Sequence, residues 1–373
     1  MKIAYVVHDF NREYGHSRYV VELATRLRLH HDVHIYASSA DNELLDGITF
    51  HKVPSVAGHA LAKIFTFLPA AAVRVGKGYD IVHAQGLVTP RFNVVTAHIC
   101  NRAWFDARRR LTLGSSWRQR AFEALVVPAE ATMYRRARSA EVIATSGNVR
   151  RELAELYGRA EHVSVIHHGV DLETFDPARW TGQVTEHRSR MGAGSPGAVL
   201  ALFVGDLRKG ADTALQALAR VPDVRLAFVS RSDSAPYQRQ AASLGVSGRV
   251  VFLPGTTSIA PYYASADIFL FPTPYDAFGM VITEAMASGL PVITTRQAGA
   301  SELIDNGRSG YVVDNASDIS SLVAALSRLV HDGEHRLSMS NAAREATRNQ
   351  TWDDVATRTM KIYERACRPA EDR

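Results

Sequence analysis

The sequence is poor in cysteine, with only Cys100 and Cys367 among 373 residues. Two cysteines cannot build the disulfide framework of a small secreted domain, and without a Cys-x-x-Cys pair they predict no zinc knuckle. They are typical of free thiols in a reducing cytosol. Glycine (25 residues) and proline (14 residues) are close to average usage, which excludes collagen-like and low-complexity chains.

Long hydrophobic runs are also missing. The longest apolar stretch, residues 60–73, contains Lys63 and Pro69 and is shorter than the ~20 residues that a membrane-spanning helix needs. The apolar run at the N-terminus ends at His8 and Asp9, which favours a strand over a signal peptide. We therefore expect a cytoplasmic protein that at most lies on the inner face of the cell membrane.

Net charge is only +5, but the charge is unevenly placed. Residues 51–150 hold 15 Lys and Arg against 5 Asp and Glu, and residues 102–120 hold six arginines and one acid, Asp106. Such a cluster attracts phosphates, acidic lipid headgroups or nucleic acid. The alternative is a solvated helix face.

Short β-rich runs alternate with amphipathic helical stretches along the whole chain. This alternation predicts right-handed βαβ crossovers and parallel sheets covered on both faces. The expected strands are residues 2–8, 33–37, 81–84, 94–98, 142–145, 199–204, 224–229, 250–253, 268–272 and 292–294, and the expected helices include residues 17–29, 60–76, 116–137, 147–157, 212–218, 279–288 and 352–366, with only helices after residue 294.

A polar, glycine-rich stretch at residues 181–197 interrupts the alternation and predicts a domain junction. We expect two doubly wound, Rossmann-like α/β domains, residues 1–180 and 198–350, that face a central cleft. In open parallel sheets, ligands bind outside the carboxyl ends of the strands. The loops that follow the strands are therefore where site residues are expected.

Two such loops carry features that suit a phosphate. Gly15 precedes the first helix and lets backbone N–H groups approach an anion, although a turn glycine is the simpler reading. Gly205 and Gly210 bracket the cations Arg208 and Lys209 at a strand-to-helix turn, which suits a diphosphate. A charged surface turn is the alternative for this second loop.

The strongest pattern runs from Tyr275 to Val292. Asp276 follows an apolar strand, the Phe278–Gly279 pair opens a helix, and Glu284 lies within that helix among apolar neighbours. A carboxylate there needs a partner, and sugar hydroxyls are suitable donors, while the first N–H groups of the helix suit a phosphate. A structural, salt-bridged glutamate is the alternative.

These residues resemble a known enzyme family. The segment from Asp276 to Glu284 is similar to the E-x7-E motif of glycosyltransferase family 4, and residues 284–292 match its continuation. Residues 165–171 resemble the family's V-I-x-N-G-V-D sequence, and residues 80–83 and 95–98 also fit. The likeness spans nearly the whole chain, and it implies the GT-B fold, a retaining hexosyltransferase and a last helix, residues 351–368, that crosses back to the first domain.

The resemblance also implies roles for individual residues. The donor would be a UDP-, GDP- or ADP-sugar held mainly by the second domain, with Glu284 on the ribose, Asp276 on the sugar hydroxyls and Lys209 on the phosphates. His98 would lie near the transferred sugar. Because the first domain of this family usually holds the acceptor, we hypothesise that Arg102, Arg108, Arg109 and Arg110 of the arginine cluster face it. The remaining implied donor contacts are Gly15, Phe278, Gly279, Met280 and Val281, and we add Arg208 and Arg231 as candidate donor contacts of this chain's own.

Several positions depart from the family pattern. Asp276 stands where glutamate is usual, Asp206 stands where a phosphate-binding arginine is common, and Tyr14 and His168 replace a glycine and an asparagine. We expect Arg208 to supply the charge that is missing at position 206. Arg231 lies where a G-x-G usually flanks the nucleotide.

The expected reaction is a front-face substitution, since no carboxylate is placed as a covalent nucleophile. Lys209, Arg208 and helix N-termini would stabilise the leaving nucleoside diphosphate, and without a D-x-D motif we expect neither metal nor cofactor. The acceptor would be a glycan, a glycolipid or a small molecule, with an anionic membrane surface as a further partner and no nucleic acid. The competing interpretation is a nucleotide-sugar-binding protein whose transferase activity is altered or lost.

Overall fold

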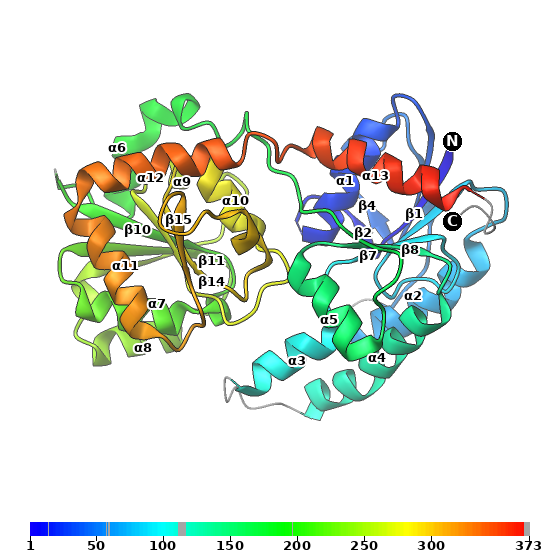
Figure 1. Ribbon diagram of the computed structural model, residues 1–373, viewed down its shortest axis with the longest axis horizontal. Coiled ribbons are helices and arrows are strands. Elements are labelled where there is room, and N and C mark those ends of the chain that lie inside the picture. The colour runs from blue at the N-terminus through cyan, green and yellow to red at the C-terminus, as the bar shows by residue number, and fades with distance from the viewer. Residues whose placement is uncertain (14, 57, 59, 111–116, 196, 369–373) are drawn as a thin grey trace. The chain divides into compact units, whose positions relative to one another are not determined.

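The computed structural model describes residues 1–13, 15–56, 58, 60–110, 117–195 and 197–368, and the chain divides into two compact units (Figure 1). Unit 1 consists of residues 1–168 together with residues 352–368, and unit 2 consists of residues 169–351. Each unit has its own parallel sheet and its own helices, which confirms the predicted doubly wound α/β class.

The boundary between the units differs from the junction expected at residues 181–197. The segments η2 (Pro177–Gln183) and α6 (Val184–Arg190) pack against α9 (Ala260–Ala264), so they belong to unit 2. The division falls after His168 instead. The polar, glycine-rich composition of residues 181–197 carried no information about which sheet the helical segments within it cover.

Within the described part of the chain, unit 1 is built on a parallel sheet in the order β5-β3-β1-β6-β7-β8-β9. Its central strands are apolar on both faces, as expected where helices cover both sides. The strands are β1 (Lys2–Val6), β3 (Asp32–Ala37), β5 (Thr49–Lys52), β6 (Ile81–Gln85), β7 (Val94–Ala97), β8 (Glu141–Ala144) and β9 (Val163–Val165), and a separate pair joins β2 (Asp9–Phe10) to β4 (Ser39–Ala40).

The helices of unit 1 end and begin where the sequence provides caps. The Ser146 side chain accepts a hydrogen bond from the Val149 N–H at the start of α5 (Gly147–Tyr157), and Gly158 ends that helix at φ 67°. The C-terminal helix α13 (Trp352–Ala366) packs on α1 (Gly15–Leu27) within unit 1. The other helices are α2 (Ala60–Arg74), α3 (Asn101–Arg110) and α4 (Trp117–Arg136).

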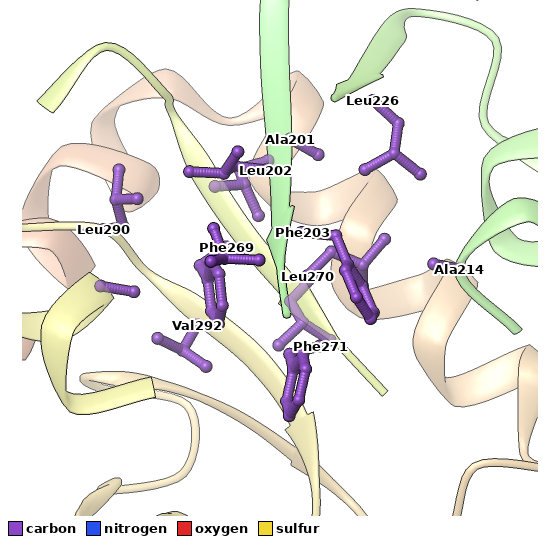
Figure 2. Close-up of a cluster of buried hydrophobic side chains, with 14 of the residues drawn as sticks. Ala201, Leu202, Phe203, Ala214, Leu226, Phe269, Leu270, Phe271, Leu290 and Val292 are labelled. Carbon is purple, nitrogen blue, oxygen red and sulfur yellow. The ribbon is translucent and has the colours of Figure 1, made fainter. Parts of the chain in front are cut away.

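Unit 2 is built on a parallel sheet in the order β12-β11-β10-β13-β14-β15. Phe203, Phe269 and Phe271 from its central strands fill the core, as Figure 2 shows, with the rings of Phe203 and Phe271 5.1 Å apart. The strands are β10 (Val199–Val204), β11 (Val224–Ser230), β12 (Val250–Pro254), β13 (Ile268–Phe271), β14 (Val292–Thr295) and β15 (Gly310–Val313), and the further helices are α7 (Ala211–Arg220), α8 (Ala235–Ser243), α10 (Met280–Ala287), α11 (Ile319–His331) and α12 (Gly333–Ala346).

The expectation of helices alone after residue 294 is wrong, because β15 adds an edge strand there. Short one-turn segments complete the described structure of both units: η1 (Asn42–Leu44), η3 (Leu207–Lys209), η4 (Ser247–Arg249) and η5 (Gly299–Leu303).

Candidate active site at the carboxyl edge of unit 2

The loop after β10 adopts a conformation that requires glycine. Gly205 and Gly210 have φ values of 122° and 106°, in the left-handed region that side chains rarely adopt. A Cβ at Gly210 would also collide with the carbonyl oxygen of Pro272, which follows β13. This close approach brings the end of η3, and with it Lys209, next to the loop after β13.

Lys209 and Asp276 meet at this point. The Lys209 Nζ atom lies 2.7 Å from Asp276 Oδ2, although 67 residues separate the two in the sequence. The carboxylate is largely buried, with 12% of its side chain exposed, whereas the lysine side chain is 39% exposed. A cation at the surface is therefore held by an acid beneath it.

The loop of Asp276 is fixed by its backbone. The Asp276 N–H donates to the Gln297 carbonyl (3.1 Å), and the Asp276 carbonyl accepts from the Gly299 N–H (2.9 Å). Phe278 is buried in the core, and its carbonyl accepts from the Ala300 N–H (2.6 Å). The loop therefore holds the start of α10 at the carboxyl edge of the sheet.

Gly279, at φ 89°, turns the chain into α10, so Met280 and Val281 form its first turn. The first N–H groups of a helix have no partner within the helix, and they lie at the positive end of its dipole. The predicted contacts Phe278, Gly279, Met280 and Val281 are thus contiguous, next to Asp276.

Glu284 lies one turn further along α10 and is 6% exposed. Its Oε2 atom accepts a hydrogen bond from the Tyr263 hydroxyl at 3.2 Å, and Tyr263 is fully buried on α9. Sequence reasoning did not identify Tyr263 as a partner of Glu284. The signal that could have found it is the need of a buried phenol for an acceptor.

The structure ties Arg208 to Asp206. The guanidinium donates from Nε to both carboxylate oxygens (3.0 and 3.1 Å) and from Nη2 to Oδ2 (2.6 Å), and the Ser232 hydroxyl also donates to Asp206 (3.2 Å). Burial opposes ionisation of Asp206, but these bonds and the arginine charge outweigh it and lower its pKa. The charge of Arg208, which we expected to replace a missing arginine, is matched by Asp206.

Arg231 is exposed after β11, and its side-chain stem passes over Gly255, where a Cβ would collide with it. Arg231 follows β11, which pairs with β10 in the sheet of unit 2. Lys209, Arg208, Arg231, Asp276 and the start of α10 all follow the carboxyl ends of strands in unit 2.

In unit 1, the predicted residues follow strands of that sheet. His98 comes directly after β7, and its Nε2 atom lies 2.8 Å from Gln85 Oε1 on β6. Burial, followed by the neighbouring His168 and His16, lowers the pKa of His98 well below its ordinary value. Gln85 was not identified from the sequence. The signal that could have found it is a polar side chain within an otherwise apolar strand. Gly15 begins α1, while Tyr14 is outside the described residues.

The expected arginine cluster is only partly a free cationic face. Arg109 forms ion pairs with Asp106 and Glu123. The Arg108 guanidinium lies 4.7 Å from the centre of the Trp104 ring. Arg102 is exposed on α3, and the Arg110 side chain is outside the described residues.

No helix among the described residues is long and apolar enough to cross a membrane. In the same part of the chain, no three His, Cys, Asp or Glu side chains gather closely enough to hold a metal ion. Neither described cysteine forms a disulfide, and Cys100 is buried while Cys367 is exposed.

Two family models match the chain. Residues 193–346 match the model described as "Glycosyl transferases group 1", and residues 14–174 match the model described as "Glycosyltransferase Family 4". The two matches cover most of unit 2 and most of unit 1, respectively.

Among curated relatives, a GDP-mannose-dependent alpha-(1-6)-phosphatidylinositol monomannoside mannosyltransferase of Mycolicibacterium smegmatis is 30% identical over 76% of this chain and 84% of its own length. A D-inositol 3-phosphate glycosyltransferase of Xylanimonas cellulosilytica is 28% identical over 95% of this chain and 93% of its own length. The sulfoquinovosyl transferase SQD2 of Arabidopsis thaliana is 34% identical over 51% of this chain, a match that spans only 37% of that protein.

Among solved structures, a sucrose-phosphate synthase from Thermosynechococcus elongatus has a TM-score of 0.80 at 20% identity and covers 98% of both chains. Anabaena Alr3699/HepE in complex with UDP-glucose has a TM-score of 0.72 at 20% identity and covers 98% of this chain and 99% of its own. At such identity the likeness concerns the fold, and it extends over both units.

Proposed function

This chain belongs to glycosyltransferase family 4, and from that premise we propose that it transfers a hexosyl group from a nucleotide-diphospho-sugar to an acceptor hydroxyl, with retention of configuration and without a metal. Relatives that match 95% and 76% of this chain are glycosyltransferases, which supports an enzyme of this type. The nucleotide sugar is a substrate, and no cofactor is part of the proposal.

The observation that carries this proposal is the ion pair of Lys209 and Asp276 beside the first turn of α10. Cleavage of the anomeric C–O bond leaves growing negative charge on a nucleoside diphosphate, and catalysis requires positive groups fixed in advance at that place. An ammonium group and a helix N-terminus supply such charge here. Binding of a diphosphate would exchange the Asp276 contact of Lys209 for a phosphate contact.

The remaining residues fit roles around the same donor. Glu284 would accept hydrogen bonds from the ribose hydroxyls, and Asp276, released from Lys209, would accept from the sugar. His98 is neutral at pH 7, because its pKa is lowered well below the ordinary value by burial. A neutral imidazole would contact the transferred sugar without opposing positive charge that develops on the anomeric carbon.

The test is the release of nucleoside diphosphate from UDP-, GDP- and ADP-sugars with a panel of acceptors. The relatives' names include a GDP-mannose-dependent enzyme, and one structural neighbour was solved with UDP-glucose, so both nucleotides belong in the panel. We expect acceptor-dependent release that persists in EDTA, and a product anomer of the same configuration as the donor. An inverted product or loss of activity in EDTA would contradict the proposed chemistry.

The second candidate is a nucleotide-sugar-binding protein with altered or lost transferase activity. It is favoured by the pairing of Arg208 with Asp206, which takes up a charge that a diphosphate would use. Tight donor binding without nucleotide release for any acceptor would support this candidate over a transferase.

We further propose that unit 1 places a glycan, glycolipid or small-molecule acceptor near α3 and α4, at an anionic surface on the cytoplasmic face of a membrane. Trp117 and Leu125 on α4 are 70% and 51% exposed, and Arg118 lies over the Trp117 ring. Exposed aromatic and cationic side chains together suit a lipid interface. Sedimentation with phosphatidylglycerol vesicles, but not with phosphatidylcholine vesicles, is expected, and equal sedimentation with both would contradict the proposal.

A further inference from the structure

A cavity lies at the edge of the unit 1 sheet opposite to the edge that carries His98. Its volume is about 430 Å³, and it is lined by residues at the amino ends of β8 and β9 and at the end of α13. Since Glu141 begins β8 and His98 directly follows β7, roughly four residues of parallel strand, about 13 Å, separate the two edges. The cavity is therefore distinct from the candidate active site.

Cationic side chains dominate the charge of this cavity. Arg365 and Arg368, from the end of α13, are the cations; His162, before β9, and one buried carboxylate, Glu141, also line the cavity. Arg365 Nη2 donates to Glu141 Oε2 (3.2 Å) and to Ser164 Oγ (2.8 Å). Both bonds use one nitrogen of a guanidinium that carries five N–H donors, so the group has capacity for an anion as well.

The backbone holds His162 at the cavity in an unusual conformation. Its φ of 53° makes it the one described residue other than glycine with a positive φ, and its carbonyl accepts from the Val142 N–H at 2.8 Å. The His162 Nδ1 atom lies 3.4 Å from Glu141 Oε1. Strain of this kind persists where the surroundings fix a side chain in place, and it concentrates at binding sites.

We propose that this cavity binds a phosphorylated sugar or polyol. Arg365 and Arg368 present the charged N–H donors that a phosphate monoester requires. Glu141 and Ser164, on the floor, present oxygen atoms that accept hydrogen bonds from hydroxyl groups. The volume falls within the range of small-metabolite pockets, roughly 300–1,000 Å³, and is larger than a single anion needs.

The test is calorimetric titration of the full chain with glucose 6-phosphate, glucose and inorganic phosphate. We expect glucose 6-phosphate to bind more tightly than either fragment. Arg365→Gln and Arg368→Gln should each weaken its binding about tenfold, the loss expected for charge-assisted hydrogen bonds. Lys361→Gln, which removes an exposed charge from the same helix outside the cavity, is the matched control and should bind normally.

Arg365→Gln removes a charged hydrogen-bond partner of the buried Glu141 carboxylate and can destabilise the fold. The double variant Arg365→Gln/Glu141→Gln removes the carboxylate charge as well. It should fold, as followed by circular dichroism, and still bind glucose 6-phosphate weakly. Glu141→Gln alone should reduce the preference for glucose 6-phosphate over inorganic phosphate. Absence of binding to the unaltered chain, equal affinity for inorganic phosphate, or equal weakening by Lys361→Gln would each overturn the proposal. The variants leave the candidate active site unaltered, because Glu141 lies at the opposite edge of the unit 1 sheet from His98 and the other substitutions lie on or after α13.

Discussion

Glu284 is a carboxylate that apolar packing alone would not retain. It is 6% exposed on α10, and the Tyr263 hydroxyl is one of its hydrogen-bond donors. Desolvation of an ionised group is expensive unless partners compensate for it. A ligand that brings two hydroxyl groups would add such partners, which is the basis for its proposed role at the ribose.

Glu284→Ala is expected to weaken binding of the donor nucleotide by roughly 1–3 kcal/mol, because the ribose hydroxyls lose their acceptor. Titration calorimetry with UDP and GDP measures this change. Glu334→Ala, at an exposed position in the same unit, is the control and should leave affinity unaltered. Unchanged affinity in Glu284→Ala would remove the residue from the site.

Lys209→Ala should lower kcat more than donor affinity, since its main partner in the proposed reaction is the departing diphosphate. Arg208→Ala, the neighbouring control, should have a smaller effect because Asp206 already holds that charge. Steady-state kinetics of both variants test this order. An equal or larger loss of kcat in Arg208→Ala would assign the phosphate contact to Arg208.

For these individual residues, the sequence predicted which side chains approach one another but not how their charges pair. Lys209 and Asp276 were both expected after strands of one sheet, and the structure brings them to 2.7 Å. The Asp206–Arg208 pair was not foreseen, because two charged residues of one short loop can point toward a ligand or toward each other. The direction depends on η3, whose short turn the sequence did not predict.

The decisive element is the turn that carries Gly205 to Gly210. It positions η3 against the loop after β13 only because Gly210 lacks a Cβ and tolerates a φ of 106°. The position of the loop after β10 relative to the loop after β13 therefore depends on this one close contact between their backbones.

Gly210→Ala is expected to lower the free energy of unfolding by about 1–3 kcal/mol from backbone strain alone, and to weaken nucleotide binding through displacement of Lys209. Gly248→Ala is the matched control, because no atom lies within 4 Å of a Cβ built there. Urea denaturation and nucleotide titration of both variants measure the two effects. A Gly210→Ala protein as stable as Gly248→Ala would show that the approach is not needed.

Elements with a strong apolar period were predictable, and short edge strands were not. The helix expected at residues 352–366 is α13, with its buried Trp352, Val355 and Tyr363. By contrast, β5 and β15 are edge strands of only four residues each, too short for a periodic pattern to mark them. Their place is set by pairing with β3 and β14, which is tertiary information.

In the whole molecule, buried histidines are concentrated in unit 1. Burial lowers the pKa of His83 to about 3, and burial together with His167 and Arg18 lowers the pKa of His168 to about 3. His83 is held by the Tyr363 hydroxyl and Thr96 Oγ1, both at 2.7 Å. Among the described histidines of unit 2, only His187 is buried.

Mild acid should therefore weaken unit 1 selectively. An unfolded histidine binds a proton below about pH 6.5, whereas these two stay neutral in the fold, so their contribution is complete above pH 6.5 and declines as the pH falls toward 3. At pH 5 each should lower the free energy of unfolding by ~2 kcal/mol. Limited proteolysis at pH 7 and pH 5 should show earlier cleavage in unit 1, and His83→Gln should reduce the difference. Preferential cleavage in unit 2 would contradict this assignment.

The fold class was the most predictable property of the molecule, because alternating β and helical stretches leave few topologies open. The N-terminal boundary of unit 2 was not predictable from this alternation, because η2 and α6 belong to unit 2 through their packing on α9. The roles of Lys209, Asp276, Glu284 and His98 stay predictions, which binding and kinetics decide.

The central claim is that unit 2 holds a nucleotide sugar through Lys209 and Glu284. The most direct measurement is a crystal structure of the protein with UDP or GDP, whichever binds more tightly. In that complex we expect a phosphate oxygen about 3 Å from Lys209 Nζ and a ribose hydroxyl about 3 Å from a Glu284 oxygen. A nucleotide bound elsewhere, or bound with both side chains turned away from it, would contradict the account.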